Sequence, residues 1–113
     1  MSTVSNIQLV APAQLGNTDA AVYTVGTSSA AKVGRAVFTN TTASATTITA
    51  GITTGGALGA STTLISARPI APGEAYVSPE LAGAVIPAGS QLHCFAAAAN
   101  AVTFTASGLL IVG

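Results

Sequence analysis

The feature that most constrains this chain is an alternation of side chains with a period of two residues. In the segment 32–39, Val33 and Val37 occupy one face while Phe38 occupies the opposite face. A period of two is typical of a β-strand, whereas a helix requires a period near 3.6. Because the pattern recurs along the chain and is rich in Val, Ile and Thr, we expect a fold built from strands, with no convincing helix.

About eight short strands separated by turns are expected, which is typical of an all-β, antiparallel, jelly-roll-like β-sandwich. Residues 1–113 are expected to form one domain, as the length allows. Most connections are short polar loops, so neighbours in sequence are expected to pair with each other. Pro12 is expected to end the first strand, and the continuous apolar run Leu109–Val112 to be buried on both sides, by a second sheet or a partner.

The stretch Leu64–Phe95 contains four of the five prolines and half of the charged side chains. Two of its segments are alike, because Ile70–Glu74 and Ile86–Ser90 each lead through a proline into a glycine. Proline sets φ for the first corner position, and glycine permits the positive φ that can follow. We therefore predict two strand-to-strand corners, with a short turn at Glu80–Ala84 between them.

Charged side chains are rare, and this excludes several classes of function. Only 5% of residues are charged and the net charge is zero, where a soluble domain usually carries about 25%. Three cations cannot neutralise a useful number of phosphates, so nucleic acid is not an expected partner. No apolar run reaches the roughly 18 residues of a membrane span, and no signal peptide is expected. A surface with so little repulsion favours coverage by protein partners.

No residue set supports catalysis, a cofactor or a metal, and we expect none of the three. His93 and Cys94 are adjacent, so on a strand they point to opposite faces and cannot form a Cys–His nucleophile. We expect one to pack in the core and the other to lie at a surface or interface. One His and one Cys cannot complete a zinc site. Gly55-Gly56 lacks the residues of a phosphate loop, and Asn40-Thr41-Thr42 is interpreted as a polar loop rather than a glycosylation site.

Three charged residues of the stretch Leu64–Phe95 are the candidate interaction residues. Glu74 and Glu80 both occur at turns and lie near Arg68 in the sequence. Paired carboxylates could serve acid–base chemistry, but ion pairing or solvation at one edge is the simpler interpretation, and such surface pairs contribute little energy. We predict that Arg68, Glu74 and Glu80 form a polar edge that faces a partner.

Several segments resemble a family of small virion proteins of tailed bacteriophages. The resemblance covers roughly residues 20–110 and rests on strand and turn patterns, since no catalytic motif is involved. The matching segments are Ala21–Val25 (AVYTV), Arg35–Asn40 (RAVFTN), Leu64–Arg68 (LISAR), Ile70–Tyr76 (IAPGEAY) and Pro79–Gly83 (PELAG).

The resemblance implies a β-sandwich subunit that decorates, or cements, a phage head and commonly assembles as a homotrimer. Its partner would be the major capsid protein or another virion protein, and it would be made in the host cytoplasm and located in the virion. A tail or baseplate component is the first alternative. A carbohydrate-binding or adhesin-like module is the second, although it would require exposed aromatic residues, and only 4% of this chain is aromatic.

Overall fold

The computed structural model describes residues 3–112, which form nine β-strands and no helix. Within these residues, therefore, no helix is long and apolar enough to cross a membrane. The strands are β1 (Thr3–Gln14), β2 (Ala21–Thr24), β3 (Ser29–Asn40), β4 (Thr46–Thr53), β5 (Thr63–Ile70), β6 (Ala75–Val77), β7 (Val85–Ile86), β8 (Gln91–Ala96) and β9 (Val102–Val112).

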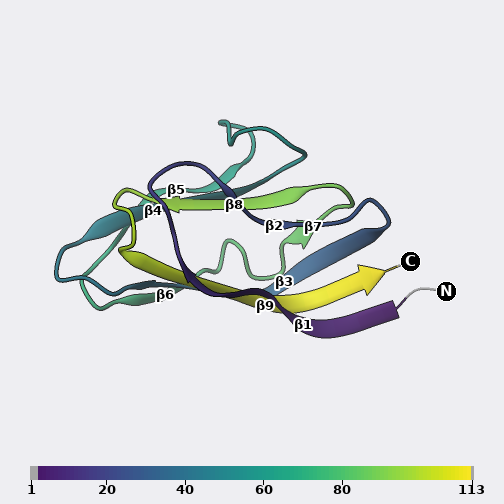
Figure 1. The fold of residues 1–113 in the computed structure, drawn as a ribbon, viewed down its shortest axis with the longest axis horizontal. Helices are drawn as coiled ribbons and strands as arrows, with labels where there is room; N and C mark the ends of the chain where they lie inside the picture. The colour runs from purple at the N-terminus through teal and green to yellow at the C-terminus, as the bar shows by residue number, and fades with distance from the viewer. Residues whose placement is uncertain (1–2, 113) are drawn as a thin grey trace.

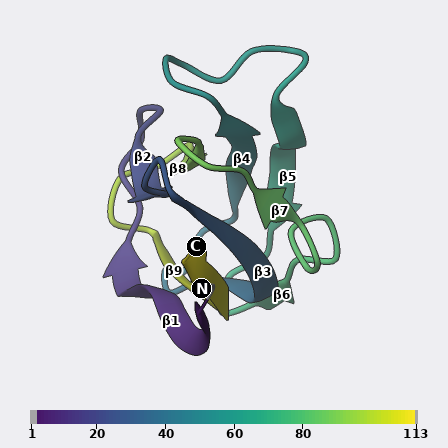
Figure 2. The same cartoon turned by 90° about the vertical axis from the view of Figure 1, so that its right-hand side faces the viewer.

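The strands form two antiparallel sheets that face each other as a sandwich (Figure 1). Sheet A has the order β1-β9-β3-β6, and β7 also pairs with β3. Sheet B has the order β2-β8-β4-β5. The turned view in Figure 2 shows the two layers with β1 at one border of sheet A. The predicted all-β, jelly-roll-like sandwich is confirmed, although it has nine strands, three of them 11 or 12 residues long.

The expectation that sequence neighbours pair is wrong for most of the chain. Only β4 and β5 are neighbours in both sequence and sheet, whereas six of the eight connections carry the chain from one sheet to the other. A short loop can join two strands of one sheet or span the gap of about 10 Å between two sheets. Loop length therefore does not distinguish a hairpin from a crossing.

The two predicted corners are confirmed as crossings between sheets. Glu74 N–H donates to Ala71 O at 3.0 Å and Gly73 has φ of 73°, which turns the chain from β5 to β6. Ser90 N–H donates to Pro87 O at 3.0 Å, and Gly89 has φ of 76°, which turns the chain from β7 to β8. The corners differ in one respect, because Pro72 occupies the first central position while Pro87 precedes the central pair.

Backbone irregularities explain two further differences from the sequence pattern. Val33 and Phe38 were assigned to opposite faces, yet both are completely buried, because the register of β3 shifts between Val33 and Arg35. This shift at Gly34 moves one half of the strand by one residue and so reverses its faces. Pro12 does not end β1, because the strand bends through register shifts there and lies at a sheet border, where a missing N–H is tolerated.

Between the sheets lies a core of apolar side chains centred on three aromatic rings. Phe38 and Phe104 are cross-strand partners with ring centroids 4.6 Å apart, and the Tyr76 ring centroid lies 6.4 Å from that of Phe38.

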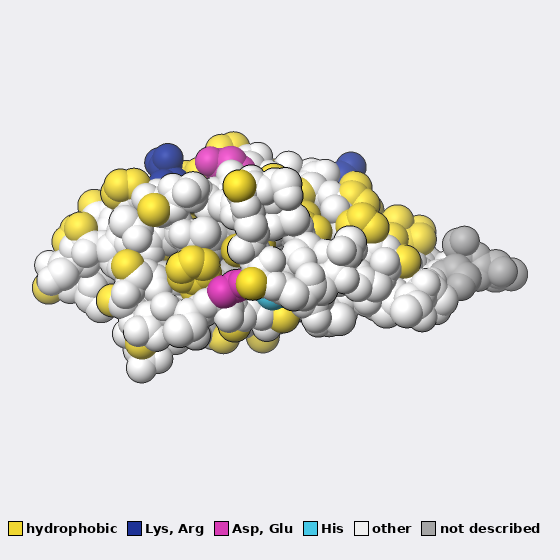
Figure 3. All heavy atoms as spheres, turned by 90° about the horizontal axis from the view of Figure 1, so that it is seen from above, with side chains coloured by type: hydrophobic (Ala, Val, Ile, Leu, Met, Phe, Trp, Pro, Cys, Tyr) yellow, Lys and Arg dark blue, Asp and Glu magenta, His cyan; other side chains and the backbone are white. Residues whose placement is uncertain are grey.

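Outside this core the surface is almost uncharged, with acidic and basic side chains as a few separate points (Figure 3). The accessible area of 5514 Å² divided by six charges leaves about 900 Å² for each.

The end of β9 contradicts the prediction that its apolar run is covered by a second sheet. Ile111 and Val112 keep 36% and 42% of their surface exposed. In Figure 1 the ends of β1 and β9 extend beyond sheet B, so sheet B does not reach them. The alternative, a covering partner, stays a prediction.

Gly108 provides a direct test of the close packing between β9 and β3. A Cβ at this position would lie 2.0 Å from the Lys32 carbonyl oxygen and 2.8 Å from the Gly34 nitrogen. We expect Gly108→Ala to lower the free energy of unfolding by at least about 2 kcal/mol, since backbone atoms must move apart. Urea denaturation measures this. Gly16→Ala is the control, because nothing lies within 4 Å of its added Cβ; equal effects of both substitutions would contradict the packing.

Candidate functional site

Arg68 and Glu80 meet at Tyr76, on the side of the sandwich where β5 and β6 approach each other. The Arg68 guanidinium, from sheet B, lies 3.9 Å from the centroid of the Tyr76 ring, from sheet A. The Tyr76 hydroxyl donates to Glu80 Oε1, and the Ser78 hydroxyl donates to the same oxygen at 3.2 Å. A cation over an aromatic face is attracted by the ring's negative potential. We call Arg68, Tyr76, Ser78 and Glu80 the Tyr76 cluster.

Glu74 belongs to a different structure, the corner between β5 and β6. Its Oε1 accepts a hydrogen bond of 2.8 Å from the Ala71 N–H, so the side chain closes the turn that contains it. The structure therefore brings two of the three predicted polar-edge residues together and gives the third a local role. The expectation was ion pairing or solvation at one edge. The salt bridge found in residues 3–112 joins His93 and Asp19, whereas Arg68 and Glu80 both contact Tyr76.

The Tyr76 cluster holds Glu80 as a carboxylate. The hydrogen bond from the Tyr76 hydroxyl, with smaller help from Ser78 and the Arg68 charge, lowers the pKa of Glu80 despite some desolvation. Burial, and then the Glu80 carboxylate, raises the pKa of Tyr76. Both groups are moved away from neutral pH, so the cluster is unsuited to proton transfer near pH 7. Its chemistry is that of a fixed surface with one cation and one anion.

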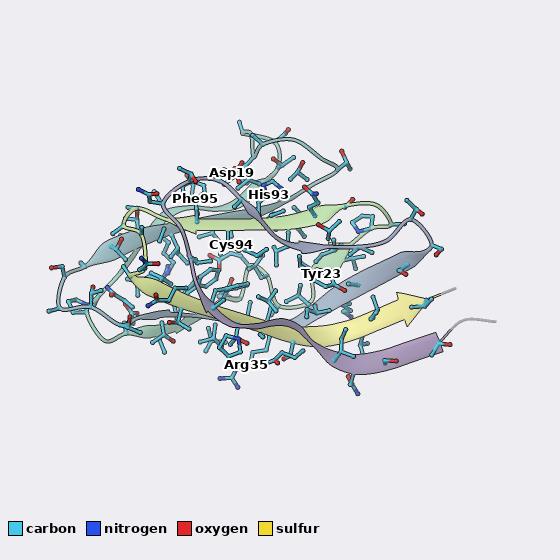
Figure 4. All side chains as sticks on the ribbon, viewed as in Figure 1. Asp19, Tyr23, Arg35, His93, Cys94 and Phe95 are labelled. Atoms are coloured by element: carbon cyan, nitrogen blue, oxygen red, sulfur yellow. The ribbon has the colours of Figure 1, made fainter. Side chains whose placement is uncertain are left out.

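A second polar cluster lies on the outer side of sheet B, around His93. The ring Nδ1 donates to Asp19 Oδ1 at 2.8 Å, and Nε2 lies 2.8 Å from Gln91 Oε1. The other carboxylate oxygen, Asp19 Oδ2, accepts the Leu58 N–H at 2.8 Å. Figure 4 shows Asp19 and His93 together above the sheet, with Cys94 pointing into the sandwich. We call Asp19, Leu58, Gln91 and His93 the His93 cluster.

The His93 cluster ties three separate segments to one another. Asp19 precedes β2, His93 lies in β8, and Leu58 lies in the glycine-rich loop between β4 and β5. Sequence patterns did not predict this contact, because His93 and Asp19 are 74 residues apart. The one available signal was that Asp19 is an isolated acid and His93 the single histidine. The glycine-rich loop between β4 and β5 is thus held at its centre by Asp19.

For the His93-Cys94 pair, the prediction that the side chains point to opposite faces is correct. The prediction that one of them lies at a surface or interface is wrong. The two side chains point to opposite faces of β8, as expected, but both are buried, since Asp19 and its loop cover the histidine. Burial, with a smaller effect of the Asp19 charge, raises the pKa of the Cys94 thiol far above its usual range. A thiol held protonated in the core is a poor nucleophile.

Asn40, the first residue of the possible glycosylation sequence, also has a structural role. Asn40 is completely buried and donates to Ser44 O at 2.8 Å and Ile70 O at 3.1 Å, so the sequence Asn40-Thr41-Thr42 shapes a loop, as interpreted. Within the described part of the chain, no group of three or more His, Cys, Asp and Glu residues lies close enough together to hold a metal ion.

Comparison with known proteins finds structures of similar fold, but no match by sequence. No protein-family model and no curated protein matches this chain. The solved structure of the infectious bursal disease virus Gx strain matches 99% of this chain, with a TM-score of 0.57 and 18% identity. The VP2 subviral particle of the same virus matches 98% (TM-score 0.54, 18% identity), and its T13 viral particle matches 97% (TM-score 0.51, 14% identity).

The chain spans about one third of the length of these viral chains, with 33%, 32% and 30% of them covered. At such low identity the likeness shows a shared fold. The resemblance to tailed-phage decoration proteins has no sequence match in its support.

We predict that Asp19→Ala loosens the glycine-rich loop. The Leu58 N–H and the His93 ring would both lose their acceptor, which should cost about 1–3 kcal/mol of unfolding free energy at neutral pH. Urea denaturation and hydrogen exchange at the Leu58 amide measure the effect. Asn17→Ala, exposed in the loop between β1 and β2 that also contains Asp19, is the control and should change stability by less than about 0.5 kcal/mol.

The same cluster predicts a loss of stability in acid. The Leu58 N–H, and to a lesser degree His93, lower the pKa of Asp19 below its ordinary value of 3.8. Ionised Asp19 therefore stabilises the folded chain above that value, and the contribution disappears as pH falls through the lower folded pKa. Asp19→Asn should flatten this part of the pH–stability curve. An unchanged acid slope in the variant would contradict the role assigned to the carboxylate.

Proposed function

We propose that this protein is a non-enzymatic structural protein of a virus particle, and specifically a capsid decoration (cement) protein of a tailed bacteriophage. The observation that carries the proposal is the likeness of 97–99% of the chain to parts of viral capsid chains with TM-scores of 0.51–0.57. The charge-poor surface supports it, because contacts with partner proteins would not require desolvation of many charges.

The proposed mechanism is mechanical. Copies bind across neighbouring capsid subunits as homotrimers, and several simultaneous contacts make each weak patch effective. Two lateral faces of roughly 800 Å² each would cover over a quarter of the 5514 Å² surface of one copy. We assign the capsid-facing edge to Arg68 and Glu80 of the Tyr76 cluster, together with Glu74 at the adjacent corner. These residues offer fixed charges of both signs on an otherwise nearly uncharged molecule.

The proposal predicts that virus particles lose heat resistance when this protein is absent. Particles lacking it should release their genome at a temperature several degrees lower than complete particles, and adding the purified protein should restore the loss. Dye access to the genome during a temperature ramp measures this. Identical release curves would contradict the cement role. A copy number per particle near that of the major capsid protein supports the head, whereas a far smaller number supports the tail or baseplate alternative.

The assignment of the capsid-facing edge has its own matched pair of variants. Arg68→Ala should reduce the amount of protein bound per particle at least several-fold at a fixed concentration. Arg35→Ala is the control, because Arg35 is exposed on the outer face of sheet A, where Figure 4 shows it pointing away from the sandwich. A stronger effect of Arg35→Ala would place the contact on the outer face of sheet A instead.

A further inference from the structure

Three of the four sheet edges in the described chain are unsuited to pairing with another strand. Exposed edges attract further strands, and proteins prevent this with short strands, charges, prolines and bulges. Two edges are protected by short strands. β2 has four residues, and β6 and β7, which together border β3, have three and two residues. β5 is longer but contains Arg68 and Pro69, and Ala67 has a positive φ of 47°, which distorts the strand.

The fourth edge, β1, has none of these protections over its first half. Thr3–Gln8 pairs with Ser107–Val112 of β9 in unbroken register, and the register shifts begin after Gln8. This half contains no charge and no proline, and it lies at the border of sheet A (Figures 1 and 2). Segments of about six uncharged residues without proline are the ones most prone to pair with further strands.

The outer face of sheet A beside this edge is also apolar and uncovered. Cross-strand partners place Val4 next to Ile111, and Asn6 next to Leu109. Val4 is 59% exposed and Ile111 36% exposed. A shallow hollow follows along the edge, lined by Asn6, Ile7, Gln8, Gly34, Ser107 and Gly108. Its two glycines carry no side chains to fill it.

We propose that Thr3–Gln8 pairs antiparallel with the same segment of a second copy, about a two-fold axis, so that sheet A continues across two subunits. The partner we assign to this edge is a second copy of the chain. The other three sheet edges of the described chain are protected, so the edge that β1 can pair with on a second copy is β1 itself. A two-fold contact places the same surface on both sides, and a segment without charge meets its own copy without repulsion.

The alternation of faces restricts the register of this seam. Residues opposite each other must lie on the same face of the continuous sheet, so the pairing can shift only by two residues. With Asn6 at the axis, Val4 lies opposite Gln8 of the second copy, on the outer face and beside the hollow. The paired segment is about 20 Å long, which gives a small contact of a few hundred Å² per partner. Such a seam is weak in solution and depends on concentration.

A charge-exchange experiment at Asn6 tests the seam. Sedimentation over a concentration series should show wild-type dimers of twice the 10.9 kDa chain mass. Asn6→Lys and Asn6→Asp should each weaken dimerisation at least 10-fold, since like charges would face each other at the axis, and an equimolar mixture of the two should restore it. The same substitutions at Asn17, exposed in a loop away from the edge, should leave the dimer unchanged.

Disulfide trapping gives a second measurement, because it accumulates even a sparsely populated dimer as a covalent product. Opposite residues of an antiparallel pair have Cα atoms about 4.5–5.5 Å apart, which is within the range of a disulfide. Oxidised Asn6→Cys should therefore form covalent dimers at least 10-fold faster than Asn17→Cys, and the native Cys94 is buried and should not interfere.

The seam is overturned if the wild type forms only monomers or only trimers, if the mixed charge variants fail to associate, or if both cysteine variants cross-link equally. If the subunits also form a three-fold contact, the wild type should form hexamers and the Asn6 variants should form trimers. That result would support the seam. None of these measurements involves a virus particle, so their failure is distinct from failure of the proposed function.

Discussion

The contact between Phe38 and Phe104 is the interaction on which most of this structure depends. The rings are cross-strand partners at the middle of sheet A, buried almost completely and 4.6 Å apart between centroids. In a chain with three phenylalanines, this pair supplies much of the large apolar surface available to the core. It joins the two long strands β3 and β9, to which β1, β6 and β7 are added.

The same aromatic group connects the core to the surface. Tyr76 stacks near Phe38, and its outer side carries Arg68 from the opposite sheet and Glu80 from the following turn. The charged groups are therefore held by a residue that is itself fixed by the core, which gives them a defined geometry without a direct ion pair. On the outer side of sheet B, the His93 cluster does the comparable task of holding a glycine-rich loop in place.

Local patterns predicted the fold class and the turns well. The period of two identified strands, and proline followed by glycine identified the corners at Ile70–Glu74 and Ile86–Ser90, because both signals act within a few residues. Predictions that required distant partners were incomplete. The register shift at Gly34 reversed the face of Val33, and the covering of His93 by Asp19 depends on a contact 74 residues away.

By itself the sequence determined that this protein is made of strands, where the chain turns, and that its surface has few charges, since these properties follow from backbone preferences and composition. The tertiary structure alone decided that most sequence neighbours lie in opposite sheets, that Arg68 and Glu80 meet at Tyr76 while Glu74 closes a turn, and that β1 is the unprotected edge. The physical reason is that strands of both sheets show the same local alternation of apolar and polar side chains. Which strands lie side by side is set by how their apolar faces pack together, and that packing joins residues far apart in the chain.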